Sequence, residues 1–144
     1  LFDASDPVFG GAIELFHNTL ANGIEAIIKK EHWDEIVAFA EFWGEHSFAG
    51  QHDESDPKNL TLIDIAVYKK GIIGPKQFVK LFGHLPIAKF LGIHRWNRQF
   101  VETVRQGKLD GITFEGVVGK AGEGHKLIMR KAKTQAWYDA VMST

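Results

Sequence analysis

The spacing of apolar residues changes from a helical period to a strand period along this chain, and this change constrains the fold more than any other feature. From Gly11 to Lys30, apolar residues recur every three or four positions, which predicts an amphipathic helix. Asn22-Gly23 marks the place where that helix could break. The patterns from Ile36 to Trp43 and from Leu60 to Tyr68 predict two strands.

The rest of the chain continues this mixture of helices and strands. In chain order, two helices, two strands and a short terminal helix are predicted over Pro75–Phe82, Asn97–Gln106, Thr113–Lys120, Lys126–Ala132 and Ala136–Val141. Asn97 is the expected cap of its helix, and Gly107 lies just beyond the end. Because helices and strands do not alternate regularly, we expect an α+β fold, a largely antiparallel sheet with flanking helices.

Composition bounds the class of protein. With 144 residues, 44% of them hydrophobic and 24% charged, the chain has the content of one folded domain. The net charge of −1 excludes a strongly basic coat protein and an acidic tail, and it leaves a local basic patch open. The absence of cysteine excludes a disulfide framework and fits the cytoplasmic location that we expect. No apolar run reaches the roughly 20 residues of a membrane span, so no membrane partner is expected.

A carboxylate and two lysines on neighbouring predicted strands form the most informative pattern. Glu115 precedes a β-branched run, and Lys131 and Lys133 stand two residues apart, so both lysines project from one face of their strand. Two ammonium groups can hold a phosphate, and a nearby carboxylate can hold the accompanying Mg²⁺. An exposed edge strand with solvated lysines and a charge-paired glutamate fits the same spacing.

Four segments resemble, in order, the motifs of the covalent nucleotidyltransferases, the superfamily of ATP-dependent RNA ligases, DNA ligases and mRNA capping enzymes. Ala40–Ser47 is similar to motif III, and Leu60–Ile65 is similar to the strand that follows it. Phe114–Lys120 is similar to motif IV, and Lys131–Lys133 is similar to motif V. Ala40 stands where the family usually has glycine. The resemblance extends from Val37 to Trp137, and the RNA ligase branch fits best.

The resemblance implies roles for five residues. It implies that Glu115 binds the catalytic metal and that Lys131 and Lys133 contact the α-phosphate of the nucleotide, where charge develops. It implies that Glu41 contacts the ribose. Ile63 stands where the family stacks an aromatic ring on adenine, and an aliphatic side chain there can still pack against the base. ATP and Mg²⁺ are the implied cofactors.

The family's nucleophile is missing from its expected place. It is the lysine of a Lys-x-Asp-Gly motif that precedes motif III and forms a lysyl–AMP intermediate, and nothing from Leu1 to Ala40 matches it. Lys108-Leu109-Asp110-Gly111 has these letters, but it follows motif III and has the composition of an ordinary turn. We therefore expect residues 1–144 to be the C-terminal portion of one nucleotidyltransferase domain, whose motif I is lost by truncation or carried on a separate chain.

These expectations combine into a predicted function. The complete enzyme would adenylate its lysine with ATP, pass AMP to an RNA 5′-phosphate and seal that end to a 3′-OH. One alternative is a non-catalytic remnant of the same fold that binds nucleotide or RNA, and another is a globular domain whose motifs are coincidental. The expected partners are RNA ends and ATP, together with a missing N-terminal segment or a second copy that pairs with an exposed sheet edge.

Histidines and tryptophans supply weaker candidates. His32, His46 and His52 do not have the spacing of a common metal site. Packing is the expected role of the tryptophans, which are Trp33, Trp43, Trp96 and Trp137. The segment His94–Arg98 is the exception, because it combines basic and aromatic residues in a predicted loop and could contact RNA bases.

Overall fold

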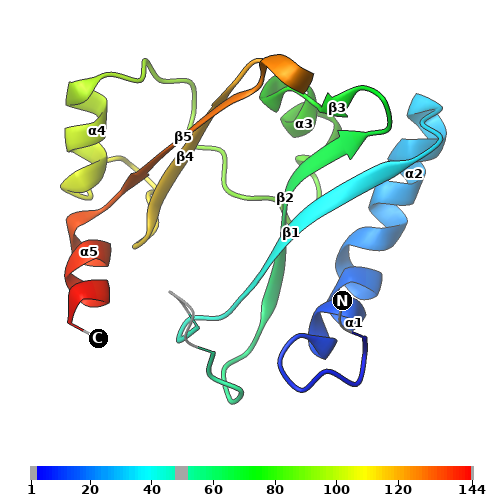
Figure 1. The fold of residues 1–144 in the computed structure, drawn as a ribbon, viewed down its shortest axis with the longest axis horizontal. Helices are drawn as coiled ribbons and strands as arrows, with labels where there is room; N and C mark the ends of the chain where they lie inside the picture. Colours follow the sequence, from blue (N-terminus) through cyan, green and yellow to red (C-terminus); the bar gives the residue numbers. More distant parts are fainter. Residues whose placement is uncertain (1–2, 48–51, 144) are drawn as a thin grey trace. The chain divides into compact units, whose positions relative to one another are not determined.

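The computed structural model describes residues 3–47 and 52–143 and divides into two compact units (Figure 1). The N-terminal unit comprises Leu1–Ala88 with Glu123–His125, and the C-terminal unit comprises Lys89–Gly122 with Lys126–Thr144. Each unit combines helices with a small antiparallel sheet, which confirms the α+β prediction. Among the described residues, no helix is long and apolar enough to cross a membrane. That the chain belongs to a single nucleotidyltransferase domain stays a prediction.

A continuous helical segment opens the N-terminal unit. It consists of α1 (Gly10–Phe16), the π-helical turn η1 (His17–Ala21) and α2 (Asn22–Glu31). The helix predicted from the apolar period is therefore confirmed, but it does not break at Asn22-Gly23. Glycine at position 23 serves close packing instead, because a side-chain carbon there would collide with Leu85.

Three antiparallel strands form the sheet of this unit. They are β1 (Ile36–Trp43), β2 (Asn59–Val67) and β3 (Gly71–Ile72), in that spatial order. β1 has the predicted bounds, and β2 lies one residue earlier than predicted. β3 escaped prediction because two residues are too short to show a period.

A bulge interrupts the register between β1 and β2. Phe39 lies opposite Asp64 and the next residue, Ala40, lies opposite Leu62, so β2 carries one extra residue, Ile63, at this point. The bulge changes the phase of the alternation along β2. As a result, side chains on both sides of it are buried in the same core, namely Leu60, Leu62, Ile65 and Val67.

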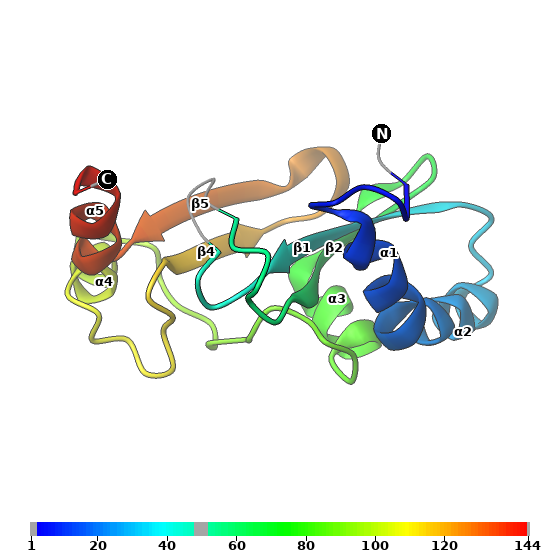
Figure 2. The ribbon, with the colours of Figure 1, turned by 90° about the horizontal axis from the view of Figure 1, so that it is seen from below.

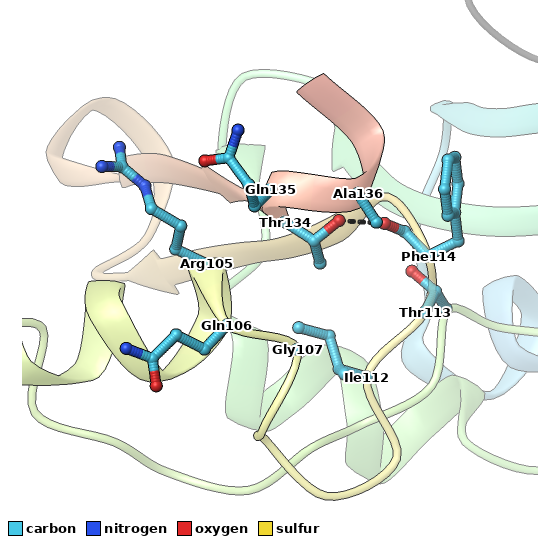
Figure 3. A pocket seen from close by; sticks show the side chains of 9 residues that line it. All are labelled: Arg105, Gln106, Gly107, Ile112, Thr113, Phe114, Thr134, Gln135 and Ala136. Atoms are coloured by element: carbon cyan, nitrogen blue, oxygen red, sulfur yellow. Dashed lines mark hydrogen bonds between the residues drawn. The ribbon is translucent and has the colours of Figure 1, made fainter. Parts of the chain in front are cut away.

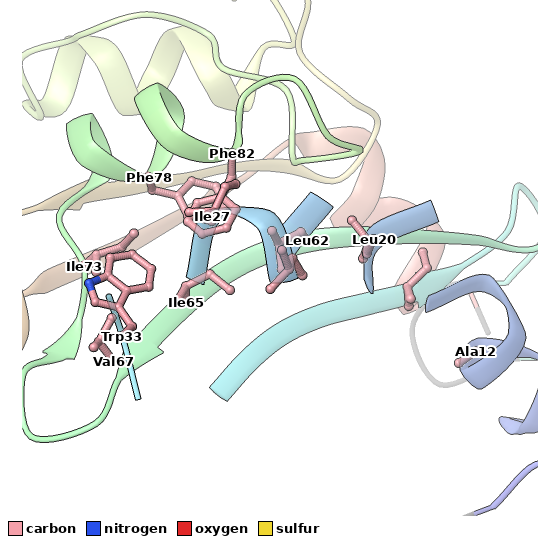
Figure 4. Close-up of a cluster of buried hydrophobic side chains, with 12 residues drawn as sticks. Ala12, Leu20, Ile27, Trp33, Leu62, Ile65, Val67, Ile73, Phe78 and Phe82 are labelled. Atoms are coloured by element: carbon pink, nitrogen blue, oxygen red, sulfur yellow. The ribbon is translucent and has the colours of Figure 1, made fainter. Parts of the chain in front are cut away.

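Helices α1, α2 and α3 (Pro75–Phe82) lie on one side of this sheet (Figure 2). α3 has the predicted bounds and starts with proline, whose fixed φ suits the first helical position. Between helices and sheet lies one hydrophobic core, drawn in Figure 4, made of Ala12, Leu20, Ile24, Ile27, Trp33, Leu60, Leu62, Ile65, Val67, Ile73, Phe78 and Phe82. The alternate side chains of β1, by contrast, include the exposed Val37, Phe39 and Trp43.

The C-terminal unit contains α4 (Arg98–Arg105), a β-hairpin and α5 (Gln135–Met142). The side chain of Asn97 accepts a hydrogen bond of 2.8 Å from the backbone N–H of Phe100, which confirms Asn97 as the cap of α4. The predicted short terminal helix is also confirmed, and it extends one residue further at each end. Thr134 caps α5 in the same way that Asn97 caps α4.

The hairpin pairs β4 (Gly116–Ala121) with β5 (Ile128–Lys133). Both predicted strands start too early. At the first, Gly116 has a φ of +131°, so the extended run begins only there. At the second, the 3₁₀ turn η2 (Gly124–Lys126) occupies the connection.

Candidate functional site

The β4–β5 hairpin brings the predicted phosphate-binding lysines to one face. Lys133 lies opposite Gly116 and Lys131 lies opposite Val118. Residues two apart on a strand share a face, so Lys131 and Lys133 lie on the same face of β5. Directly opposed residues of an antiparallel pair also share a face, so the Val118 side chain lies on the face of these lysines. Lys131 is exposed, and among the described residues it makes no ion pair.

Glu115 joins these lysines at the start of β4. Its carboxylate forms an ion pair with the ammonium group of Lys133, and its backbone carbonyl accepts a hydrogen bond of 3.2 Å from the N–H of Thr134. The Lys133 ammonium also lies 4.6 Å from the centroid of the Trp137 ring on α5. Glu115 and Lys133 are therefore in direct contact, and a carboxylate and an aromatic ring both position Lys133.

The glycine that follows Glu115 makes this contact sterically feasible. A Cβ atom at Gly116 would collide with the carbonyl oxygen of Ala132 across the hairpin. The φ of +131° at Gly116 also lies in a region that side-chain-bearing residues rarely adopt. The Glu-Gly pair in the sequence thus reflects a backbone requirement as well as the chemistry of the carboxylate.

Glu115 would be a single protein ligand for a Mg²⁺ ion held mainly by a nucleotide, and this role stays a prediction. The Oε1 atom of Glu115 contacts Lys133, and the Glu115 side chain as a whole is 51% exposed. The described residues contain no cluster of three or more His, Cys, Asp or Glu side chains that would hold a metal by themselves. Mg²⁺ commonly takes one or two protein carboxylates and completes its shell with water and substrate phosphates.

A shallow cavity of about 340 Å³ lies next to this site within the C-terminal unit (Figure 3). It is lined by Arg105, Gln106, Gly107, Ile112, Thr113, Phe114, Thr134, Gln135 and Ala136. The hydroxyl of Thr134 donates a hydrogen bond to the carbonyl oxygen of Phe114, so two of the lining residues are joined directly. Phe114 and Thr134 adjoin Glu115 and Lys133 in sequence, but the two charged residues themselves do not line it.

Glu41 and Ile63, the other residues given a nucleotide role, lie in the N-terminal unit. Glu41 is exposed and lies opposite Thr61 on β2. The Thr61 hydroxyl accepts a hydrogen bond of 2.8 Å from the indole N–H of Trp43, next to Glu41 on the same face of β1. Ile63 is half-buried at the bulge. The structure thus places both residues on β1 and β2, as predicted, and their nucleotide contacts stay predictions.

Lys108, the lysine of the Lys-Leu-Asp-Gly segment, belongs to the end of α4. The N–H of Gly107 donates to the carbonyl of Val104, and the N–H of Lys108 donates to the carbonyl of Thr103. With Gly107 in the left-handed conformation, at a φ of +67°, this is a Schellman motif. The segment therefore terminates a helix, and the Lys108 side chain is exposed.

Sequence analysis missed a buried carboxylate in the loop between β1 and β2. The carboxylate of Asp56 accepts hydrogen bonds from the backbone N–H of His46, at 2.9 Å, and from the hydroxyl of Ser47, at 3.1 Å. It also lies 3.7 Å from the ammonium group of Lys58. Burial acts to raise the pKa of Asp56, but these hydrogen bonds and the lysine outweigh it, so the pKa lies below its usual value. The signal available in the sequence was the Asp-Pro-Lys run in a polar loop.

Comparison with known proteins identifies no relative of the chain. No protein-family model, no curated protein and no solved structure matches it.

Proposed function

We propose that this chain supplies the metal- and phosphate-binding part of an ATP-dependent RNA ligase-type nucleotidyltransferase. The observation that supports the proposal best is the hairpin arrangement, in which Glu115 contacts Lys133 and Lys131 shares the face of Lys133. The order of the four motif-like segments along the chain gives the proposal its reaction class. RNA ends and ATP are the substrates, and Mg²⁺ is the metal.

Each residue of the hairpin has a distinct task in this proposal. Lys131, which is exposed and makes no ion pair among the described residues, is the more available cation for a nucleotide phosphate. Lys133 is held by Glu115 and by the Trp137 ring, so its ammonium group is positioned before the nucleotide arrives. Glu115 offers its carboxylate to Mg²⁺, which neutralises phosphate charge when bound.

These contacts predict weak binding of ATP. A hydrogen bond to a charged group contributes about 1.5–3 kcal/mol net, whereas association costs an estimated 4–15 kcal/mol. Two lysines and one metal ligand barely exceed that cost. We expect a dissociation constant no lower than about 1 mM, which corresponds to roughly −4 kcal/mol.

A titration with ATP and Mg²⁺, followed by ¹H–¹⁵N NMR, tests the proposal. Substituting Lys131→Gln should raise the dissociation constant about 10-fold or more, since one charge-assisted contact is lost. The matched control is Lys108→Gln, which removes an exposed lysine of the same unit from a helix-terminating turn. The proposal fails if Lys131→Gln and Lys108→Gln bind ATP equally well.

One observation favours the alternative of a non-catalytic nucleotide- or RNA-binding module. The only Lys-x-Asp-Gly in the chain is at Lys108, whose backbone completes the Schellman motif. Intact mass after incubation with ATP and Mg²⁺ distinguishes the two functions. Micromolar ATP binding without a lysyl–AMP adduct would favour the binding module, whereas an adduct on Lys108 would show that this segment contains the nucleophile.

A further inference from the structure

The near-zero net charge of this chain conceals a strong separation of charge. The C-terminal unit contains ten Lys and Arg residues against four Asp and Glu residues, a formal charge of +6. Because the whole chain carries −1, the N-terminal unit carries −7. A concentration of positive charge in one part of a chain is typical of a surface that binds a polyanion.

An aromatic cluster lies against one face of the β4–β5 hairpin. The Trp96 ring occupies the space where a Cβ atom of Gly119 would be. Its centroid lies 5.3 Å from that of Phe100, and the His94 ring stacks on Phe100 at 4.9 Å. These rings pack the segment before α4 against the hairpin.

Three arginines neighbour Trp96, two along the chain and one through the hairpin register. Arg95 adjoins Trp96 in sequence and Arg98 lies two residues after it, while Arg130 lies directly opposite Gly119 in the hairpin register. All three side chains are exposed, and none forms an ion pair with another described residue. Glu102 lies one turn along α4 from Arg98, but basic residues of this unit still outnumber acidic ones by six, and such an excess favours an external polyanion.

This arginine surface, defined as Arg95, Arg98 and Arg130 around Trp96, is separate from the candidate nucleotide site. Arg130 precedes Lys131 on β5, and successive side chains of a strand point to opposite faces. Arg130 and Trp96 therefore lie on one face of the hairpin, and Lys131 and Lys133 lie on the other. Arg95 and Arg98 lie next to Trp96 along the chain.

We infer that the arginine surface binds the phosphodiester backbone of the RNA strand; the choice of RNA as the polyanion rests on the proposed function. Guanidinium groups bind phosphate oxygens in a bidentate manner, and several unpaired guanidinium groups suit the repeated charges of a strand. The exposed His94 ring, stacked on Phe100, offers a face to an unpaired base.

Fluorescence anisotropy with a labelled 12-nucleotide single-stranded RNA tests this inference. The double substitution Arg98→Gln with Arg130→Gln should raise the dissociation constant about 10-fold or more. It should also reduce the slope of log affinity against log salt by about 1.4, because each phosphate contact on a single strand contributes about 0.7. The matched control, Lys76→Gln with Lys80→Gln, removes two exposed lysines of α3 and should leave both quantities unchanged.

Two results would overturn the inference. If Lys131→Gln with Lys133→Gln abolishes RNA binding while the arginine variant binds normally, the strand lies on the lysine face. If the arginine variant loses only a salt-sensitive self-association in sedimentation, the surface binds the acidic N-terminal unit of a second copy.

Titration with ATP and Mg²⁺ separates this test from that of the proposed function. The arginine variant should retain wild-type ATP affinity, and a chain that binds RNA through these arginines without binding ATP would contradict only the proposed function.

Discussion

At the scale of single residues, backbone geometry explains positions that chemistry alone would not. Gly116 and Gly107 both have positive φ values, +131° and +67°. They differ in their surroundings, because a Cβ atom at Gly116 would collide with Ala132, whereas a Cβ atom at Gly107 would have no atom within 4 Å. Substituting alanine at Gly107 would therefore cost stability through the backbone conformation alone. Substituting alanine at Gly116 would add the cost of a collision.

We expect Gly116→Ala to destabilise the protein more than Gly107→Ala. The unfavourable backbone conformation alone costs about 1–3 kcal/mol at Gly116 and about 1–2 kcal/mol at Gly107, and the collision with Ala132 adds to the first. Urea denaturation of the two variants measures the difference. Equal unfolding midpoints would show that the hairpin backbone shifts enough to accommodate the added methyl group without loss of stability.

A second prediction at this scale concerns pH and Asp56. A carboxyl whose pKa is lowered by folding adds stability above its usual pKa of 3.8, and this stability is lost as the pH falls through the lower, folded value. Asp56→Asn should therefore be less stable than the wild type at pH 7, and the gap should narrow as the pH falls below the usual carboxyl pKa of 3.8. Thermal melting across this range measures the gap. A gap that stays constant with pH would assign the loss to packing of the loop instead of to charge.

At the scale of elements, α4 is fixed at both ends by local hydrogen bonds. Asn97 caps its start and the Schellman motif of Gly107 and Lys108 completes its end. These signals lie within the helix sequence or next to it, which is why its bounds were predictable to within one residue.

Asn97→Ala should destabilise the C-terminal unit by about 1 kcal/mol, since an N-cap substitution costs about 0.5–2 kcal/mol. Asn97→Asp, which keeps an acceptor for the N–H of Phe100, should retain most of the stability. Chemical denaturation followed by tryptophan fluorescence, to which the Trp96 near this cap contributes, provides the measurement. If alanine and aspartate at this position have the same effect, the cap does not stabilise α4.

At the scale of the whole molecule, the chain first passes from one unit to the other between Ala88 and Lys89, and it passes again on either side of Glu123–His125. Lys89 and Arg95 are exposed and lie outside helices and strands, which are the conditions that favour proteolysis. We expect limiting trypsin to cut first after one of these residues, as identified by mass spectrometry of the earliest fragments. Lys89→Gln with Arg95→Gln should delay that first cut. A first cut within β5 would instead indicate that the hairpin opens before the boundary does.

The sequence by itself determined most of the elements and part of the candidate site. The period of apolar residues placed β1 and α3 with their observed bounds, and the two-residue spacing of Lys131 and Lys133 placed them on one face. These features depend on interactions between residues that are near in sequence, such as a cap or the alternation of a strand. They can therefore be inferred from a short window of the chain.

Only the tertiary structure decided how distant segments meet. It showed the bulge at Ile63, the ion pair between Glu115 and Lys133, and the position of the Trp96 ring over Gly119. It also showed the division into two units, which reveals the separation of charge that the net value hides. Register and close packing depend on contacts between segments far apart in the chain, and no local preference specifies which of the many sterically allowed pairings is formed.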